Sequence, residues 1–470
     1  MGRIKRFIKT AGTYLAGNVL SKLVSFFLIP LYTNKLTTTD YGDYDVVITM
    51  ITLLVAVAFF QLWDGMFRFS FDFEDNDDKY RIINVCMKGY GLGLIVFSIA
   101  FTVLSKVMPL TYPLLTYVFG ILFGLQYMYS FAARVFLLNN LFVASGLANT
   151  LTIAATNIVL ILYYHMGVQS LYYAQIAGCL VQIIIIEKKL KLFSNTCNTF
   201  FSITLFKRIL KFSLPLCIAT VSYWLLSGYT KIVINSICGS NENGLFAVAS
   251  SFAGMAVIAV NVFQFAWNET AYLMANEKTR ISTYRKCIDL LFCTVWICCA
   301  AFCSAISIIF PYFVGKSFQE SAVVIPYLMI GISANAIAGF LGTLFMTEQK
   351  TSYIMISTLA AAFTNIALSG RFTRSSGLIG AVVVLSASFI LLLLLRLIYV
   401  KRTMGITVSA VSLLSILTVV PSIIIYTHTM GVMVNIAYIL FLIFCYFIAA
   451  QNITGLRVKE VINTITRKKE

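Results

Sequence analysis

A single lysine interrupts an apolar run near the start of the chain. The run GTYLAGNVLSKLVSFFLIPLYTN, residues 12–34, is long enough to cross a bilayer, and Lys22 lies near its middle. At 1.5 Å per residue, Lys22 lies roughly 17 Å from either interface, which is farther than a lysine side chain reaches. An unpaired cation at that depth costs several kcal/mol. Lys22 must therefore face a water-filled cavity, a counter-charge or an anionic ligand.

The neighbours of Lys22 favour a cavity. Asn18 and Ser25 lie four residues before and three residues after it, so the three side chains share one side of a helix. Pro30 predicts a kink near the outer end of this helix, a position suited to a hinge. No Asp or Glu lies near the middle of any apolar run, so Lys22 has no evident buried carboxylate partner. Two readings stay open: an anionic ligand site, or an internal ion pair that holds two helices together.

Three other cations could contact a ligand, and each also has a plain structural reading. Arg68 lies four residues after Asp64 at the cytoplasmic end of the second run, so the two can pair there. Arg134 ends the fourth run and could equally be an anchor at the membrane surface. Lys231 continues the polar face of the seventh run but lies close enough to the outer interface to snorkel. That polar face carries Thr220, Tyr223 and Ser227.

The elements that position these residues are membrane-spanning helices. Of the 470 residues, 60% are hydrophobic and only 11% are charged, which is unlike a soluble domain. We expect about fourteen spans in an all-α polytopic membrane protein. They cover 11–33, 45–67, 88–107, 111–133, 141–164, 169–187, 211–236, 244–268, 287–310, 322–345, 352–369, 377–399, 406–427 and 432–451.

The placement of the basic residues predicts the orientation. With the N-terminus inside, 28 of the 35 lysines and arginines lie in inner segments and six in outer ones. Both termini are therefore expected in the cytoplasm. Because the charges lie in short loops between spans, the net charge of +17 does not indicate nucleic acid. The eleven cysteines and two histidines follow no metal-binding spacing, so no metal is expected.

The chain contains an internal repeat. DYGDYDVV at 40–47 resembles ENGLFAVA at 242–249, and ATNIVL at 155–160 resembles FTNIAL at 363–368, which pairs Gly42 with Gly244 and Asn157 with Asn365. The two asparagines could also simply bond neighbouring helices. We expect two parallel six-helix repeats around a central cavity, with two extra C-terminal helices. The predicted parts are 1–187, a basic cytoplasmic linker at 188–210, 211–400, and 401–470 with its basic tail.

The chain resembles a known family over roughly residues 10–400, and the most specific motifs lie near the N-terminus. GNVLSKLVSFFLIPLYTNKLTTTDYGDY, with Lys22, Pro30 and the turn at Gly42, and WDGMFRF, with Asp64 and Arg68, are similar to bacterial polysaccharide-unit flippases of the Wzx type. These belong to the multidrug/oligosaccharidyl-lipid/polysaccharide exporter (MOP) superfamily. The chain departs from the usual turn after span eleven, where SGRFTRSSG stands at 369–377.

The resemblance implies a fold and a substrate. The fold would be twelve core spans plus two, arranged as a V-shaped pair of bundles. The substrate would be an oligosaccharide on undecaprenyl diphosphate, flipped to the outer leaflet of the bacterial inner membrane for O-antigen, capsule or exopolysaccharide synthesis. Lys22 would contact the diphosphate, and Arg68 and Arg134 become candidate headgroup contacts. A monomer is expected, with membrane lipids and a polysaccharide polymerase and chain-length proteins as partners.

Other functions stay open. A cation-coupled multidrug exporter of the same superfamily would want an acidic residue in its cavity, where this chain shows a lysine. A polymerase would be expected to hold a sizeable outer loop, and the outer loops here are short. An acyltransferase would need a positioned base, and no histidine lies inside a span. We therefore expect no enzyme activity and no cofactor, with H⁺ or Na⁺ as a conceivable coupling ion.

Overall fold

The computed structural model describes residues 17, 19–73, 75–108, 110–197, 202–255, 280–348, 350, 352–427 and 431–454. Those residues form helices joined by short turns, with no strand among them. Eleven of the helical segments are long and apolar enough to cross a membrane. This confirms the prediction of an all-α polytopic membrane protein. The predicted spans 11–33 and 244–268 extend into residues outside the described part.

Contacts divide the chain into two compact units, Met1–Asn235 with Gly239–Gly244, and Ser236–Cys238 with Leu245–Glu470. After a helical stretch at 19–27, the helices up to the end of the first unit are α2 (Ile29–Lys35), α3 (Thr38–Ala58), α4 (Leu62–Ser70), α5 (Asn76–Val107), α6 (Pro113–Val135), α7 (Asn139–Ile158), the π-helix η1 (Val159–Tyr163), α8 (Gln169–Leu190), α9 (Leu192–Cys197), α10 (Ile203–Ser227) and α11 (Tyr229–Cys238).

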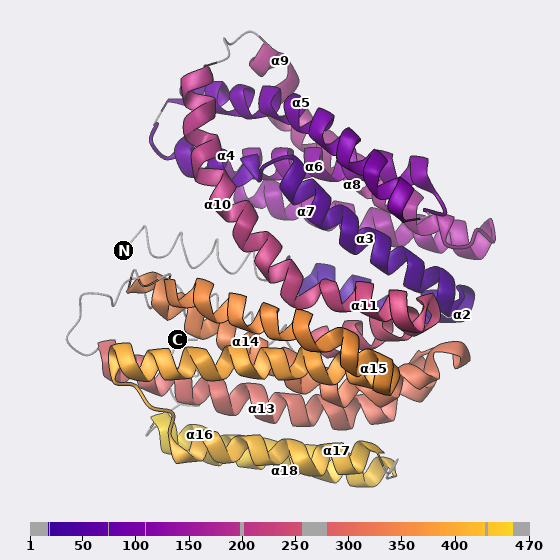
Figure 1. Ribbon diagram of the computed structural model, residues 1–470, viewed down its shortest axis with the longest axis vertical. Coiled ribbons are helices and arrows are strands. Elements are labelled where there is room, and N and C mark those ends of the chain that lie inside the picture. The colour runs from indigo at the N-terminus through magenta and orange to yellow at the C-terminus, as the bar shows by residue number, and fades with distance from the viewer. Residues whose placement is uncertain are drawn as a thin grey trace, which may run out of the picture. The chain divides into compact units, whose positions relative to one another are not determined.

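Helix α10 belongs to the first unit by packing. It lies against α3, α4 and α5 (Figure 1). The boundary predicted at 188–210 separates sequence repeats and stays a prediction, whereas the boundary between packed units falls between residues 235 and 245, at the end of α11 and just beyond it. A helix that follows the linker therefore helps to build the first unit.

The second unit begins with helical residues up to 255 and continues with α13 (Arg280–Phe313), the 3₁₀ helix η2 (Lys316–Val324), α14 (Ile325–Thr347), α15 (Ser352–Met404), α16 (Ala410–Leu414), the 3₁₀ helix η3 (Ser415–Thr418), α17 (Val419–Thr427) and α18 (Val432–Thr454). The last elements, from α16 to α18, pack along α13 (Figure 1). Asp289 on α13 accepts hydrogen bonds from Ser409 N and Ser412 Oγ, both at 2.8 Å, and so fixes the start of α16.

The segment α15 contains two helices. A straight helix of 53 residues would be about 80 Å long, more than twice the thickness of a bilayer core. The backbone leaves helical geometry at Ser376 and Gly377, where Gly377 has a φ of +58°. This break separates the predicted spans 352–369 and 377–399. The buried guanidinium of Arg396 then donates hydrogen bonds to Ser357 Oγ and Thr358 Oγ1, both at 3.2 Å, and so ties the two helices together.

In the first unit, the predicted span 45–67 is not continuous. Helix α3 ends at Ala58 and α4 begins at Leu62, and between them Phe60 and Gln61 have φ values of +54° and +46°. Such left-handed conformations are unusual for residues with bulky side chains. This break could not be predicted from local sequence, because residues 59–61 include neither Gly nor Pro.

An aromatic stack anchors the break. The Phe59 ring stacks on Tyr90 at a centroid distance of 4.4 Å and on Phe97 at 5.7 Å. Glycines provide the space, since a Cβ on Gly93 would come within 2.5 Å of Phe59 Cδ1 and one on Gly120 within 2.3 Å of Phe97 Cζ. Small residues allow such close approach between membrane helices.

We predict that Gly93→Ala lowers the stability of the protein. The added methyl group would overlap the fully buried Phe59, and overpacking of this kind costs roughly 1–3 kcal/mol. Gly91→Ala on the same helix is the matched control, because its Cβ would meet no atom within 4 Å and alanine favours helix. Thermal unfolding in detergent should show a lower melting temperature for Gly93→Ala alone. Equal melting temperatures for the two variants would contradict the packing role of Gly93.

Candidate functional site

Lys22 lies on the helical stretch at 19–27 and is exposed within the structure. Among the residues that the structure describes, no carboxylate forms an ion pair with it. Ser25 on the same stretch is also exposed, and its hydroxyl donates to Ser21 O at 3.0 Å. Asn18 lies outside the described residues. The alternative that Lys22 is held in an internal ion pair finds no partner in the described part of the chain.

The helix of Lys22 is interrupted close to Pro30. The interruption lies at Leu28, and Pro30 stands in the first turn of α2. Proline has no N–H for the preceding turn, which explains why helix bonding is interrupted here. A hinge at this position stays a prediction.

The two matched asparagines of the repeat have different partners. On α7, the buried Asn157 donates to the Tyr32 hydroxyl at 2.9 Å and so links α7 to α2, whereas Asn365 accepts from Ser369 Oγ at 2.7 Å in the second unit.

Arg68 takes part in an ion cluster at the end of α4. Asp72 bridges Arg68 and Arg208, each at 3.1 Å. Two guanidinium groups therefore share one carboxylate, which leaves the cluster with a net positive charge. Both arginine side chains are more than half exposed, so the cluster can still receive an anion.

Arg134 lies at the end of α6 among aromatic rings. Its guanidinium carbon is 4.4 Å from the ring centre of Phe67, 4.9 Å from that of Phe131 and 5.7 Å from that of Phe142. It also interacts electrostatically with Asp64 on α4. Cation–π contacts hold an arginine in a low-dielectric setting while leaving its N–H groups to bind other acceptors.

Lys231 is paired. Its ammonium lies 2.7 Å from Asp45 Oδ1, and both side chains are about one-fifth exposed. The amide of Asn243 donates to Gly42 O at 2.8 Å and lies 3.4 Å from Asp45 Oδ2. The start of α3, including the predicted Gly42, is thereby fastened to residues 240–244 and to α11.

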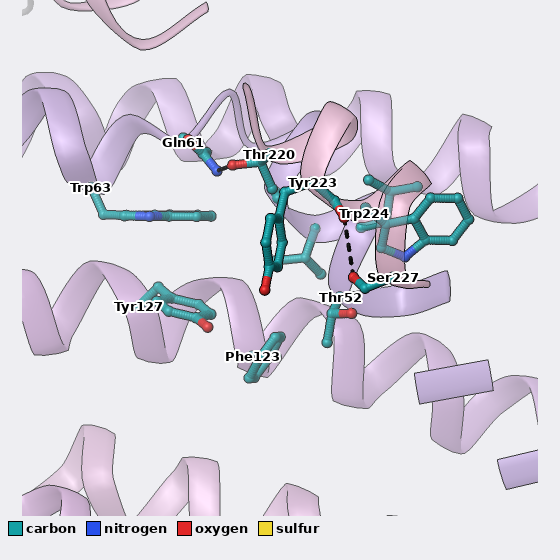
Figure 2. A pocket seen from close by; sticks show the side chains of 12 residues that line it. Thr52, Gln61, Trp63, Phe123, Tyr127, Thr220, Tyr223, Trp224 and Ser227 are labelled. Carbon is teal, nitrogen blue, oxygen red and sulfur yellow. Dashed lines mark hydrogen bonds between the residues drawn. The ribbon is translucent and has the colours of Figure 1, made fainter. Parts of the chain in front are cut away.

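A cavity of about 270 Å³ lies within the first unit, beside the break between α3 and α4. Its lining residues are Thr52, Leu53, Val55, Ala56, Gln61, Trp63, Phe123, Tyr127, Thr220, Tyr223, Trp224 and Ser227. Figure 2 shows the amide of Gln61 directed at Thr220, to which it donates a hydrogen bond. The rings of Trp63 and Tyr127 stack with their centres 4.8 Å apart.

Part of this cavity was predictable from the sequence. Thr220, Tyr223 and Ser227 were predicted as one polar face, and all three line it. The contribution of Trp63 and Tyr127 was missed, because aromatic residues in membrane helices are common and carry no periodic signal. The predicted substrate contacts Lys22, Arg68, Arg134 and Lys231 do not line this cavity.

The arrangement of helices is shared with known transporters. The structure of the lipid II flippase MurJ in an inward closed conformation superposes with a TM-score of 0.68 at 14% identity, over 93% of this chain and 97% of that one. A multidrug resistance MATE family transporter of the MOP superfamily, in its inward-facing conformation, gives 0.65 at 12% identity, over 82% and 94%. A MOP superfamily transporter from Pyrococcus furiosus gives 0.57 at 12% identity, over 85% and 95%. At these identities the likeness shows a shared fold, which is that of MOP-superfamily transporters.

The sequence itself assigns the family. The chain belongs to the polysaccharide biosynthesis protein family, whose pattern matches residues 7–267, more than half of its length. No curated protein matches the sequence. The family is that of polysaccharide biosynthesis proteins and the fold is shared with the MurJ and MATE structures, which together confirm the family resemblance found in the sequence motifs.

We predict that Asp45 and Lys231 are energetically coupled. Removing either charge alone, by Asp45→Asn or Lys231→Gln, should lower the melting temperature, because the remaining charge keeps a partly buried position without its partner. The double variant should lose less than the sum of the single losses, with a coupling of about 1 kcal/mol. Denaturation of all four proteins in detergent measures this. Additive losses would show that the ion pair contributes nothing to stability.

Proposed function

We propose that the protein flips an undecaprenyl-diphosphate-linked oligosaccharide from the inner to the outer leaflet of the cytoplasmic membrane. The product would serve assembly of a surface polysaccharide such as O-antigen, capsule or exopolysaccharide. The observation that supports this most directly is the family match together with Lys22, an exposed cation within an apolar helical stretch. A diphosphate is the part of such a lipid that a cation would bind.

In this proposal the charged residues act in sequence. The cluster at Arg68 and Arg208 and the aromatic-framed Arg134 attract the diphosphate at the cytoplasmic ends of α4 and α6. Lys22 then binds the headgroup within the span, where low dielectric strengthens the attraction. The polyprenyl chain stays in lipid throughout, and no covalent bond is made or broken.

Alternating exposure of the site to the two sides of the membrane would move the headgroup across. A proton or sodium gradient is proposed as the driving force, with a polysaccharide polymerase and chain-length proteins as partners downstream and the protein acting as a monomer. Both termini are proposed to lie in the cytoplasm.

We predict that Lys22→Ala removes most of the flipping activity, whereas Lys22→Arg retains a larger part of it. A charge-assisted hydrogen bond contributes roughly 1.5–3 kcal/mol, so its loss should slow flipping by at least about tenfold. The measurement is outer-leaflet arrival of an undecaprenyl-diphosphate-linked oligosaccharide in proteoliposomes. Lys35→Ala is the matched control, because Lys35 is an exposed lysine in the last turn of α2, at the outer end of the same predicted span.

Two results would contradict this prediction. If Lys22→Ala flips as well as the native protein, the diphosphate cation must be sought at Arg68 or Arg134. If native protein moves cationic dyes and no lipid-linked oligosaccharide, the protein is an exporter of the multidrug type. Melting temperatures close to that of the native protein are required of each variant, so that a loss of flipping is not a loss of folding.

A further inference from the structure

The cavity of the first unit is lined entirely by uncharged side chains. Aromatic rings form its walls, and hydroxyl and amide groups provide its polar atoms (Figure 2). A diphosphate would need cations or many N–H donors here, and a drug cation would favour a carboxylate. The lining suits neither of these ligands, since no Asp, Glu, Lys, Arg or His is among its residues.

The polar groups of the cavity keep hydrogen-bonding capacity for a ligand. The hydroxyls of Thr52 and Ser227 donate to backbone carbonyls, to Thr49 O at 2.8 Å and to Tyr223 O at 3.1 Å, so their oxygens can still accept. Gln61 uses its amide N–H on Thr220, which leaves the Gln61 carbonyl as an acceptor and the Thr220 hydroxyl proton as a donor. Tyr127 adds a hydroxyl that can donate or accept.

The backbone conformation at Gln61 is unusual. Phe60 and Gln61 both adopt left-handed conformations, which place the Gln61 side chain at the cavity. Left-handed backbone at bulky residues is costly and tends to persist at ligand sites. The stack of Phe59 on Tyr90 holds this conformation from the other side of the break.

We propose that this cavity is the subsite for one neutral sugar ring of the lipid-linked substrate. A sugar has C–H faces that pack on aromatic rings, here the more exposed Tyr127 and Tyr223, and hydroxyls that both donate and accept, here toward Gln61 and Thr220. The cavity volume of about 270 Å³ lies just below the range of pockets for drug-sized ligands, which suits a single sugar ring. The subsite rests on the flippase function proposed above and adds that the sugar is uncharged.

The experiment compares the bare lipid diphosphate with four sugar-bearing forms of it in detergent. Undecaprenyl diphosphate and the same lipid carrying N-acetylglucosamine, glucose, galactose or glucuronic acid are titrated, and dissociation constants are obtained from thermal shift. We expect at least one neutral sugar to tighten binding roughly tenfold over the bare diphosphate, with no gain from glucuronic acid, whose carboxylate the cavity cannot pair.

Conservative variants locate the effect. Gln61→Met keeps the shape of the side chain without its hydrogen bonds, and Tyr127→Phe keeps the ring without its hydroxyl. Each should lose most of the gain from the sugar and leave the affinity for the bare diphosphate unchanged. Tyr173→Phe is the matched control, since Tyr173 is 41% exposed, close to the 37% of Tyr127, but does not line the cavity.

The outcomes separate this subsite from the flippase function itself. If bare and sugar-bearing lipids bind equally well to the native protein, the sugar subsite is wrong while the diphosphate site stands. The same conclusion follows if sugar tightens binding but Gln61→Met and Tyr127→Phe keep the whole gain. If neither lipid binds, both proposals fail together.

Discussion

The stacking of Phe59 on Tyr90 and Phe97 is the interaction on which the break between α3 and α4 depends. A break in a membrane helix exposes backbone groups that lipid cannot satisfy. Here those groups are bonded within the protein: Gln61 N donates to Ala56 O at 3.1 Å, and Leu62 N to Phe59 O at 3.2 Å. With Phe59 held by its neighbours, the chain can turn through two left-handed residues and continue as α4.

This break has a chemical consequence for the placement of charge. Because α4 begins anew at Leu62, the residues before it face an uncharged cavity, while Arg68 at its far end joins a charged cluster with Asp72 and Arg208. A lipid-linked sugar also has two chemistries, an anionic diphosphate and a polar ring with apolar faces. The separation of cations from the aromatic cavity provides a different environment for each, and no single pocket has to satisfy both.

The fold was largely predictable from the sequence, and the cavity only in part. Long apolar runs predict membrane spans because a helix needs about 20 apolar residues to cross the hydrocarbon core. The division of α15 also follows, since 53 residues are too many for one span, and Gly377 lies at the break. The break at Phe60 and Gln61 could not be predicted, since it results from tertiary stacking and not from local propensity. Gln61 and Thr220 are 159 residues apart, so their meeting depends on how α10 packs against α3 and α4. The ion pair of Lys231 with Asp45, 186 residues away, could not be predicted either, because it also depends on tertiary packing.

The weak internal repeat gains a physical meaning at Gly42 and Gly244. A Cβ on Gly42 would come within 1.9 Å of Ser240 O, and a Cβ on Gly244 within 2.0 Å of Thr38 O. These contacts are reciprocal, because Ser240 is the repeat counterpart of Thr38 at the same offset that pairs the two glycines. The same steric limit therefore acts on both copies of the repeated segment. Glycine is required at each position because backbone opposes backbone there, so the match between Gly42 and Gly244 reflects this contact.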